Sequence, residues 1–199
     1  MRPVTPDRSN AAFRAFCQET SPSAEPVWLD VIPVSHAVPL ECFETVRRQV
    51  ECYGGHAVYG WQAWEWRGLF LEAEFHAVWL TPDGQLRDIT PKPAPVAMIA
   101  FLPAPDRRFE GRRVPNVRRA ITADARVQEF IRLCDEEWTI MNRGERASQR
   151  QFTLQPAEVR VLERIVSRKH ALGVALGLDA DEPLPLRLAP RQVGLDQRA

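Results

Sequence analysis

The sequence predicts an α+β protein in which one helix precedes an antiparallel three-stranded meander and further helices follow it. The first observation is the distribution of the 17 prolines among 199 residues, because none falls within residues 40–81, 116–155 or 157–182. Proline is poorly tolerated inside helices and central strands, so these windows should hold the regular structure. The second observation is a helical spacing of apolar residues in each window. The third is a pair of long strand-like runs in the first window.

The bulk composition suits one domain that folds around its own core without disulfide bonds. The chain is 45% hydrophobic and 26% charged, and it balances 26 basic against 26 acidic residues. No overall charge therefore attracts it to nucleic acid or to an anionic membrane. The first ten residues lack the apolar core of a signal peptide, and no run approaches membrane-spanning length. The four cysteines form no CxxC pair. Together these features favour a cytoplasmic protein with reduced thiols.

The segments before the meander differ in character. Residues 1–25 are polar and rich in Ser, Pro and Thr, which predicts a flexible N-terminal arm. Residues 27–38 are apolar and β-branched but interrupted by proline, which is typical of edge-like extended segments. In LECFETVRRQVECYGG, apolar residues recur at helical spacing from Phe43 to Val50, and the Gly-Gly pair supplies a C-terminal stop.

The meander is predicted from three runs: AVYGWQAWEW, LFLEAEFHAVWL and QLRDITP. A short Arg-Gly break separates the first two, and TPDG separates the last two. Residues 91–121 read as mainly loop, apart from a short apolar run at 96–102. We therefore expect residues 26–121 to form the α+β core of the domain.

The remaining chain is predicted to be helical and then irregular. From Val127 to Met141, apolar residues fall at i, i+3, i+4, i+7, i+11 and i+14, which places them on one helical face. A second helix should begin near Pro156. Residues 122–178 are thus expected to be a helical part of the same domain, and residues 179–199 a polar, proline-rich tail.

Three residues form a constellation that suggests nucleophilic catalysis. Cys42 lies at the predicted amino end of a helix, where unpaired N–H groups and partial positive charge favour the thiolate. His76 lies within a strand, and a neighbouring imidazole would lower the thiol pKa further and later protonate a leaving group. Asp88 lies on the next strand, where a carboxylate would fix the tautomer of the imidazole.

The turn between these strands determines whether Asp88 can reach His76. The sequence TPDG at residues 81–84 suits a type I turn followed by a left-handed glycine, which makes a three-residue hairpin loop. Paired residues then sum to 166, so Asp88 faces Val78 and His76 faces Thr90. By strand alternation, His76 and Asp88 are diagonal neighbours on one face. A two-residue turn would place them on opposite faces.

This order of Cys, His and Asp resembles the papain-like superfamily of cysteine hydrolases, which includes the NlpC/P60 peptidases and the transglutaminase-like proteins. The strings that carry the resemblance are CFETV, GGHAVYGWQAWEW, EAEFHAVWL and DGQLRDITP. They cover roughly residues 39–105, and no specific family within the superfamily is identified. The resemblance implies a helix packed against an antiparallel sheet, with Cys42 as nucleophile, His76 as general base and Asp88 as the orienting acid.

Other residues are candidates for supporting roles. Papain-like members often place an oxyanion-binding Gln a few residues before the Cys, but this chain has none there. His36 is the best side-chain substitute, with the backbone N–H of Cys42 as a second donor. Trp61, Trp64 and Glu74 are candidates for substrate binding. The tryptophans also suit core or cleft-wall positions, and Glu74 also suits the solvated rim of the sheet.

The main functional expectation is a cysteine hydrolase or acyltransferase that acts on an amide in a peptide, isopeptide or glutamine side chain, without a cofactor. An alternative is a non-catalytic interaction module that binds an acidic protein or nucleic acid through the Arg-rich loop 107–119 and the C-terminal helices. A metal site that uses Cys42 and His76 is a further option. No tight ligand pair supports it, so no metal is expected. The sequence does not indicate an oligomeric state.

Overall fold

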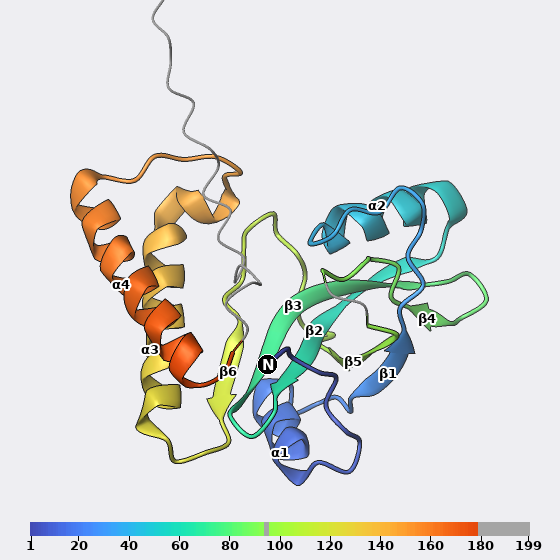
Figure 1. Ribbon diagram of the computed structural model, residues 1–199. Coiled ribbons are helices and arrows are strands. Elements are labelled where there is room, and N and C mark those ends of the chain that lie inside the picture. Colours follow the sequence, from blue (N-terminus) through green and yellow to red (C-terminus); the bar gives the residue numbers. More distant parts are fainter. Residues whose placement is uncertain (94–95, 179–199) are drawn as a thin grey trace, which may run out of the picture.

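The computed structural model describes residues 1–93 and 96–178, and it is an α+β fold as predicted (Figure 1). Within these residues, an antiparallel sheet of six strands is combined with four α-helices. The elements are α1 (Ala11–Thr20), β1 (Val27–Asp30), α2 (Cys42–Tyr53), β2 (His56–Trp66), β3 (Phe70–Leu80), β4 (Leu86–Arg87), β5 (Met98–Pro103), β6 (Val117–Ala120), α3 (Ala125–Met141), a 3-10 turn (Gly144–Ser148) and α4 (Pro156–Ala175). The strands run in the order β1-β5-β2-β3-β4, and β6 also pairs with β3.

The turn between β3 and β4 has the predicted register. Leu80 faces Leu86 and Trp79 faces Arg87, as a three-residue loop requires. Gly84 has a φ of +83°, a left-handed conformation that glycine adopts without steric cost.

The third strand of the meander is shorter than predicted. β4 ends at Arg87, and Asp88 instead forms an isolated parallel bridge with Val31, just after β1. The N–H of Ile32 donates to the Asp88 carbonyl over 2.8 Å. Asp88 is therefore held by the segment that leads from β1 toward α2, and the chain has already left the ladder with β3.

This departure leaves a gap along one edge of β3. β6 pairs with the start of β3, from Phe70 to Ala73, and β4 pairs only with Trp79 and Leu80. Among the described strands, none pairs with residues 74–78 on that edge. Backbone groups at this gap are free to meet a side chain from another element.

Two helices pack on the same face of the β2–β3 hairpin, the face that carries Trp61 and Ala77. α1 buries Phe13 and Phe16 in a cluster that includes Trp61, and α2 buries Val46 against Ala77. At the turn end of the hairpin, α3 and α4 lie side by side beyond β6 and share a core with Trp66 and Phe70 (Figure 1).

Residues 1–25 differ from the flexible arm that the sequence predicts. Ten of them form α1, which Asn10 caps by accepting the N–H of Phe13. Phe13 is fully buried, and Val4 bridges Glu65 of β2. Burial of an aromatic face gives this short helix the tertiary support that polar flanking residues do not indicate.

Residues 91–121 also contain more structure than predicted, because β6 lies within them as well as β5. The helices expected within residues 122–178 are present as α3 and α4, and α4 begins at Pro156 as predicted. The expected tail, 179–199, lies outside the described residues. No helix in the described part of the chain is long and apolar enough to cross a membrane.

Candidate functional site

The gap in β3 is where Cys42 meets the sheet. Cys42 is the first residue of α2, and it packs with Val46, Ala77, Trp79 and Ile89. Its sulfur accepts a hydrogen bond from the backbone N–H of Ala77, on the stretch of β3 that lacks a strand partner on this edge. The early end of β4 thus leaves an N–H donor for the thiol.

His76 and Asp88 complete the triad that the sequence predicts. His76 hydrogen-bonds the Cys42 thiol, and its Nε2 lies 3.3 Å from Oδ1 of Asp88. Since Nε2 faces the carboxylate, Nδ1 is the ring nitrogen left for the sulfur. Asp88 Oδ1 also accepts the N–H of Thr90 over 3.1 Å. An acceptor at Nε2 favours the tautomer whose Nδ1 can take a proton from the thiol.

Burial and charge act against each other on this triad. Burial raises the pKa of Cys42, but the charge and hydrogen bond of His76, the Ala77 N–H and the charge of Lys92 outweigh it, so the pKa lies below its ordinary value. Burial lowers the pKa of His76, yet Cys42 and Asp88 raise it to about 9 against the opposing charge of Lys92. Such shifts favour a thiolate paired with an imidazolium, the reactive form of a catalytic cysteine.

The carboxyl group of Asp88 is suited to remain ionised. It is fully buried, and burial raises its pKa, but His76 and then Lys92 lower the pKa below its ordinary value. Lys92 Nζ lies 2.5 Å from Oδ2 of Asp88. The carboxylate therefore faces His76 and the Thr90 N–H with Oδ1 and Lys92 with Oδ2, and it can hold the imidazole in place.

Lys92 is the site residue that the sequence interpretation missed. Its Nζ also donates to Gln62 Oε1 over 2.8 Å and lies 3.3 Å from His76 Nε2. A compositional signal was available. Only two of the 26 basic residues are lysines, and both of them, Lys92 and Lys169, are buried in ion pairs.

Glu74 extends the polar surface of the hairpin beyond the triad. It accepts the indole N–H of Trp64 over 3.1 Å, and Asn116 Nδ2 lies 3.5 Å from it and 3.0 Å from Glu72. Burial raises the pKa of Glu74, and the charge of Glu72 raises it further. Glu74 and Trp64 thus form an internal hydrogen-bonded pair on the His76 face.

The other candidates are more dispersed. Trp61 is buried on the opposite face, against Phe75 and under the guanidinium of Arg107. His36 is half-buried, with an Nε2 that has no hydrogen-bond partner. Among the described residues, no recorded contact joins His36 or Trp61 to Cys42, so their assigned roles stay predictions.

The amino end of α2 is shaped by an unusual backbone conformation. Leu40 has a φ of +68°, which non-glycine residues rarely adopt, and its side chain is 60% exposed. Glu41 then occupies the N-cap position without a side-chain capping bond. The first N–H groups of a helix have no intrahelical acceptor, so the Cys42 N–H remains available to an oxyanion.

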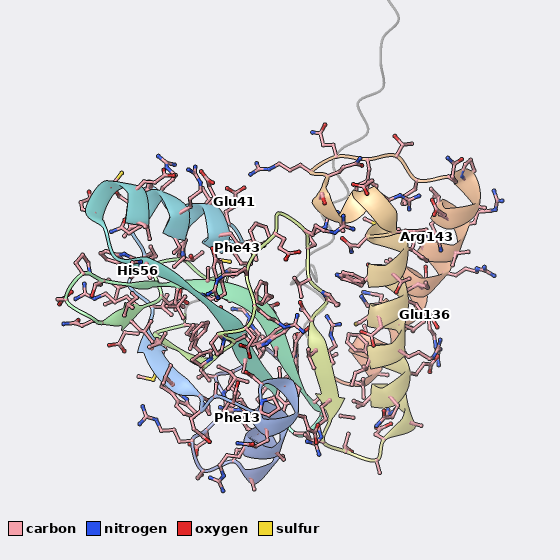
Figure 2. The ribbon with its side chains drawn as sticks, turned by 180° about the vertical axis from the view of Figure 1, so that it is seen from behind. Phe13, Glu41, Phe43, His56, Glu136 and Arg143 are labelled. Atoms are coloured by element: carbon pink, nitrogen blue, oxygen red, sulfur yellow. The ribbon has the colours of Figure 1, made fainter. Side chains whose placement is uncertain are left out.

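The triad is largely closed to solvent. Cys42 is 7% exposed and His76 is 6% exposed. Figure 2 shows Phe43 at the amino end of α2 beside the loop between β5 and β6. Phe109 of that loop stacks on Phe43 with ring centroids 3.8 Å apart. Small reagents therefore suit a first test of thiol reactivity better than bulky ones do.

The arginines of the loop 107–119 already have partners within the chain. Arg112 and Arg113 bind the 3-10 turn and its surroundings, and Arg118 pairs with Glu72 and Asp135. The other three are also engaged: Arg107 over Trp61, Arg108 with carbonyls of its own loop, and Arg119 with Glu19. These contacts anchor the loop to the protein.

In the described part of the chain, no group of three Cys, His, Asp or Glu side chains is arranged to hold a metal ion. Comparisons with protein-family models, curated proteins and solved structures find no match for this chain. The likeness to papain-like hydrolases consequently rests on the order of the three residues and on the sequence around them.

Proposed function

We propose that the protein is a cysteine-dependent hydrolase or acyltransferase that acts on an amide and works in the cytoplasm, where thiols stay reduced. The observation that carries the proposal is the convergence of Cys42, His76 and Asp88 at the gap in β3. Nucleophile, base and orienting acid then have the connectivity of a catalytic triad. A peptide, isopeptide or glutamine side chain would supply the amide.

The proposed reaction can be followed through the protons that His76 gives and takes. The Cys42 thiolate attacks the amide carbon, and the Cys42 N–H stabilises the negative oxygen that develops. The His76 imidazolium gives its proton to the departing amine, which leaves a thioester on Cys42. Neutral His76 then takes a proton from water, or from an incoming amine, as that nucleophile attacks the thioester and releases the thiolate.

Alkylation by iodoacetamide across pH 5–9 tests the proposal, with the rate at each cysteine followed by peptide mass spectrometry. Cys42 should react at pH 6 clearly faster than a model thiol with the ordinary cysteine pKa of about 8.5, which is almost fully protonated there. Cys17 and Cys134 are internal controls, because burial raises the pKa of Cys17 to about 12 and also raises the pKa of Cys134. Cys52 is exposed and reports on reagent access.

A pair of histidine variants separates catalysis from general damage. His76→Ala should remove most of the Cys42 reactivity at pH 6, because burial then acts on the thiol without the neighbouring imidazolium. His56→Ala is the matched control, since His56 is exposed at the start of β2. The proposal is wrong if Cys42 follows the pH dependence of the model thiol and His76→Ala leaves its rate unchanged.

The interaction-module hypothesis has no specific observation in its favour. Each arginine that it would use already has a partner within the chain. The triad is different, because packing alone does not explain it. Burying a charged group is costly unless a partner stabilises it, so a buried arrangement that favours a thiolate is better explained by catalysis than by stability.

A further inference from the structure

Lys92 is a buried cation in contact with two members of the triad. Its side chain is 6% exposed, and its Nζ lies 2.5 Å from Asp88 Oδ2, 2.8 Å from Gln62 Oε1 and 3.3 Å from His76 Nε2. The reaction proposed above needs a nucleophile, a base and an orienting acid, and none of these roles requires a lysine. A buried lysine at this place therefore needs its own explanation.

The protonation cycle of His76 provides one. When His76 is an imidazolium, its charge balances the carboxylate of Asp88. When His76 has given up its proton, a fully buried Asp88 would have no counter-ion, and an uncompensated buried charge is strongly unfavourable. Without another cation, Asp88 would hold the proton on His76. The ammonium of Lys92, which lies against Oδ2, is a second counter-ion for Asp88 in both states.

The geometry also orients the carboxylate. Lys92 takes Oδ2, whereas Oδ1 faces His76 Nε2 and accepts the N–H of Thr90. Gln62, on β2, holds the ammonium from its other side. A rotation of the Asp88 carboxylate would break both its contact with Lys92 and its contact with His76.

We propose that Lys92 is a positioning residue, which fixes Asp88 against Nε2 of His76 and allows His76 to release its proton in each cycle. The catalytic meaning of this inference rests on the proposed function, but the effect of Lys92 on His76 does not. The neutral ring of His76 then carries its proton on Nε2, directed at Asp88. The ammonium of Lys92 donates to Gln62 and forms an ion pair with Asp88 Oδ2.

Ring nitrogen shifts of His76 test this directly, measured by long-range proton–nitrogen NMR from pH 6 to 12 and assigned with His76→Ala. In Lys92→Met, His76 should lose its proton at a pH about one to three units higher than in the wild type, because a like charge this close shifts a pKa by that much. Lys169→Met is the matched control. It removes the other buried lysine, which pairs with Glu137 between α3 and α4.

Three results would overturn the inference. The first is that His76 titrates at the same pH in the wild type and in Lys92→Met. The second is that Lys169→Met gives an equal shift. The third is that the neutral wild-type ring carries its proton on Nδ1. Should Lys92→Met fail to fold, Lys92→Gln keeps donors for Asp88 and Gln62 without the charge, and it must show an upward shift. In a Cys42→Ala background the shift should persist, so an unreactive Cys42 would refute the proposed function and leave this inference standing.

Discussion

Gly60 offers a sharp test of the packing beneath the site. It faces His76 across the β2–β3 ladder and Pro103 across the β2–β5 ladder. A Cβ at this position would lie 2.3 Å from the carbonyl oxygen of Leu102 and 2.6 Å from the ring of Phe101. Phe101 is completely buried, and the carbonyl belongs to a strand, so neither group can move without displacing β5.

The cost of Gly60→Ala follows from these contacts. Overpacking of a well-packed interior costs typically about 1–3 kcal/mol, and each ladder hydrogen bond weakened as β5 moves adds about 1 kcal/mol. We therefore expect the free energy of unfolding to fall by about 3 kcal/mol. For a chain of this length, that corresponds to roughly 6–12 °C in Tm. Gly60 does not have a positive φ, so the loss must come from packing.

Urea unfolding followed by circular dichroism and by tryptophan fluorescence measures the effect. Gly173→Ala, within α4, is the matched control. A Cβ there meets only Leu178, at 3.9 Å, which is an ordinary contact distance. Alanine should stabilise that helix by about 0.5–1 kcal/mol. The two identical substitutions are thus expected to have opposite signs. A Gly60→Ala protein within 0.5 kcal/mol of the wild type would contradict the close approach of β5 to β2, while Gly173→Ala verifies the assay.

Three further changes give independent tests. Deletion of Gly84 leaves a two-residue loop whose first residue, Pro82, cannot take the positive φ that such loops need. The register should therefore shift, and iodoacetamide labelling of Cys42 at pH 6 should fall by about tenfold or more. Asparagine tolerates the left-handed conformation, so Gly84→Asn should keep the reactivity. Leu40→Gly should raise the free energy of unfolding in urea slightly, by about 0.5 kcal/mol, because it removes a side chain from a left-handed backbone conformation. Val38→Gly, a change at another exposed position of the same loop, should lower the free energy of unfolding, and equal effects of the two would argue against strain at Leu40. The folded-state pKa of Asp88 lies below the unfolded value, so its stabilisation is present above about pH 4 and is lost as pH falls through the folded-state pKa. The free energy of unfolding should accordingly fall less steeply with decreasing pH in Asp88→Asn than in the wild type. An equal fall in both proteins would show that Asp88 is not held ionised.

The site was predictable where its geometry depends on local chemistry. The turn residues at 81–84 determine the register of β4 up to Arg87, which directs the chain back toward His76, and helical spacing after Pro39 places Cys42 at a helix start. Parts that depend on distant contacts were not predictable in the same way. β6 reads as polar loop in the sequence, and it becomes a strand only because residues 70–73 of β3 offer it a partner. The bridge between Asp88 and Val31, which opens the gap for Cys42, is equally non-local.

Lysine usage shows that composition can carry positional information that patterns of hydrophobicity do not. The chain meets nearly all of its need for positive charge with arginine, and its two lysines are both buried beside a carboxylate. Arginine is planar and wide, with its charge spread over a fork of donors, whereas lysine offers a compact charge at the end of a slim stem. At both positions the ammonium lies against a carboxylate in a buried place, and an arginine there would bring a wider group into the same contacts.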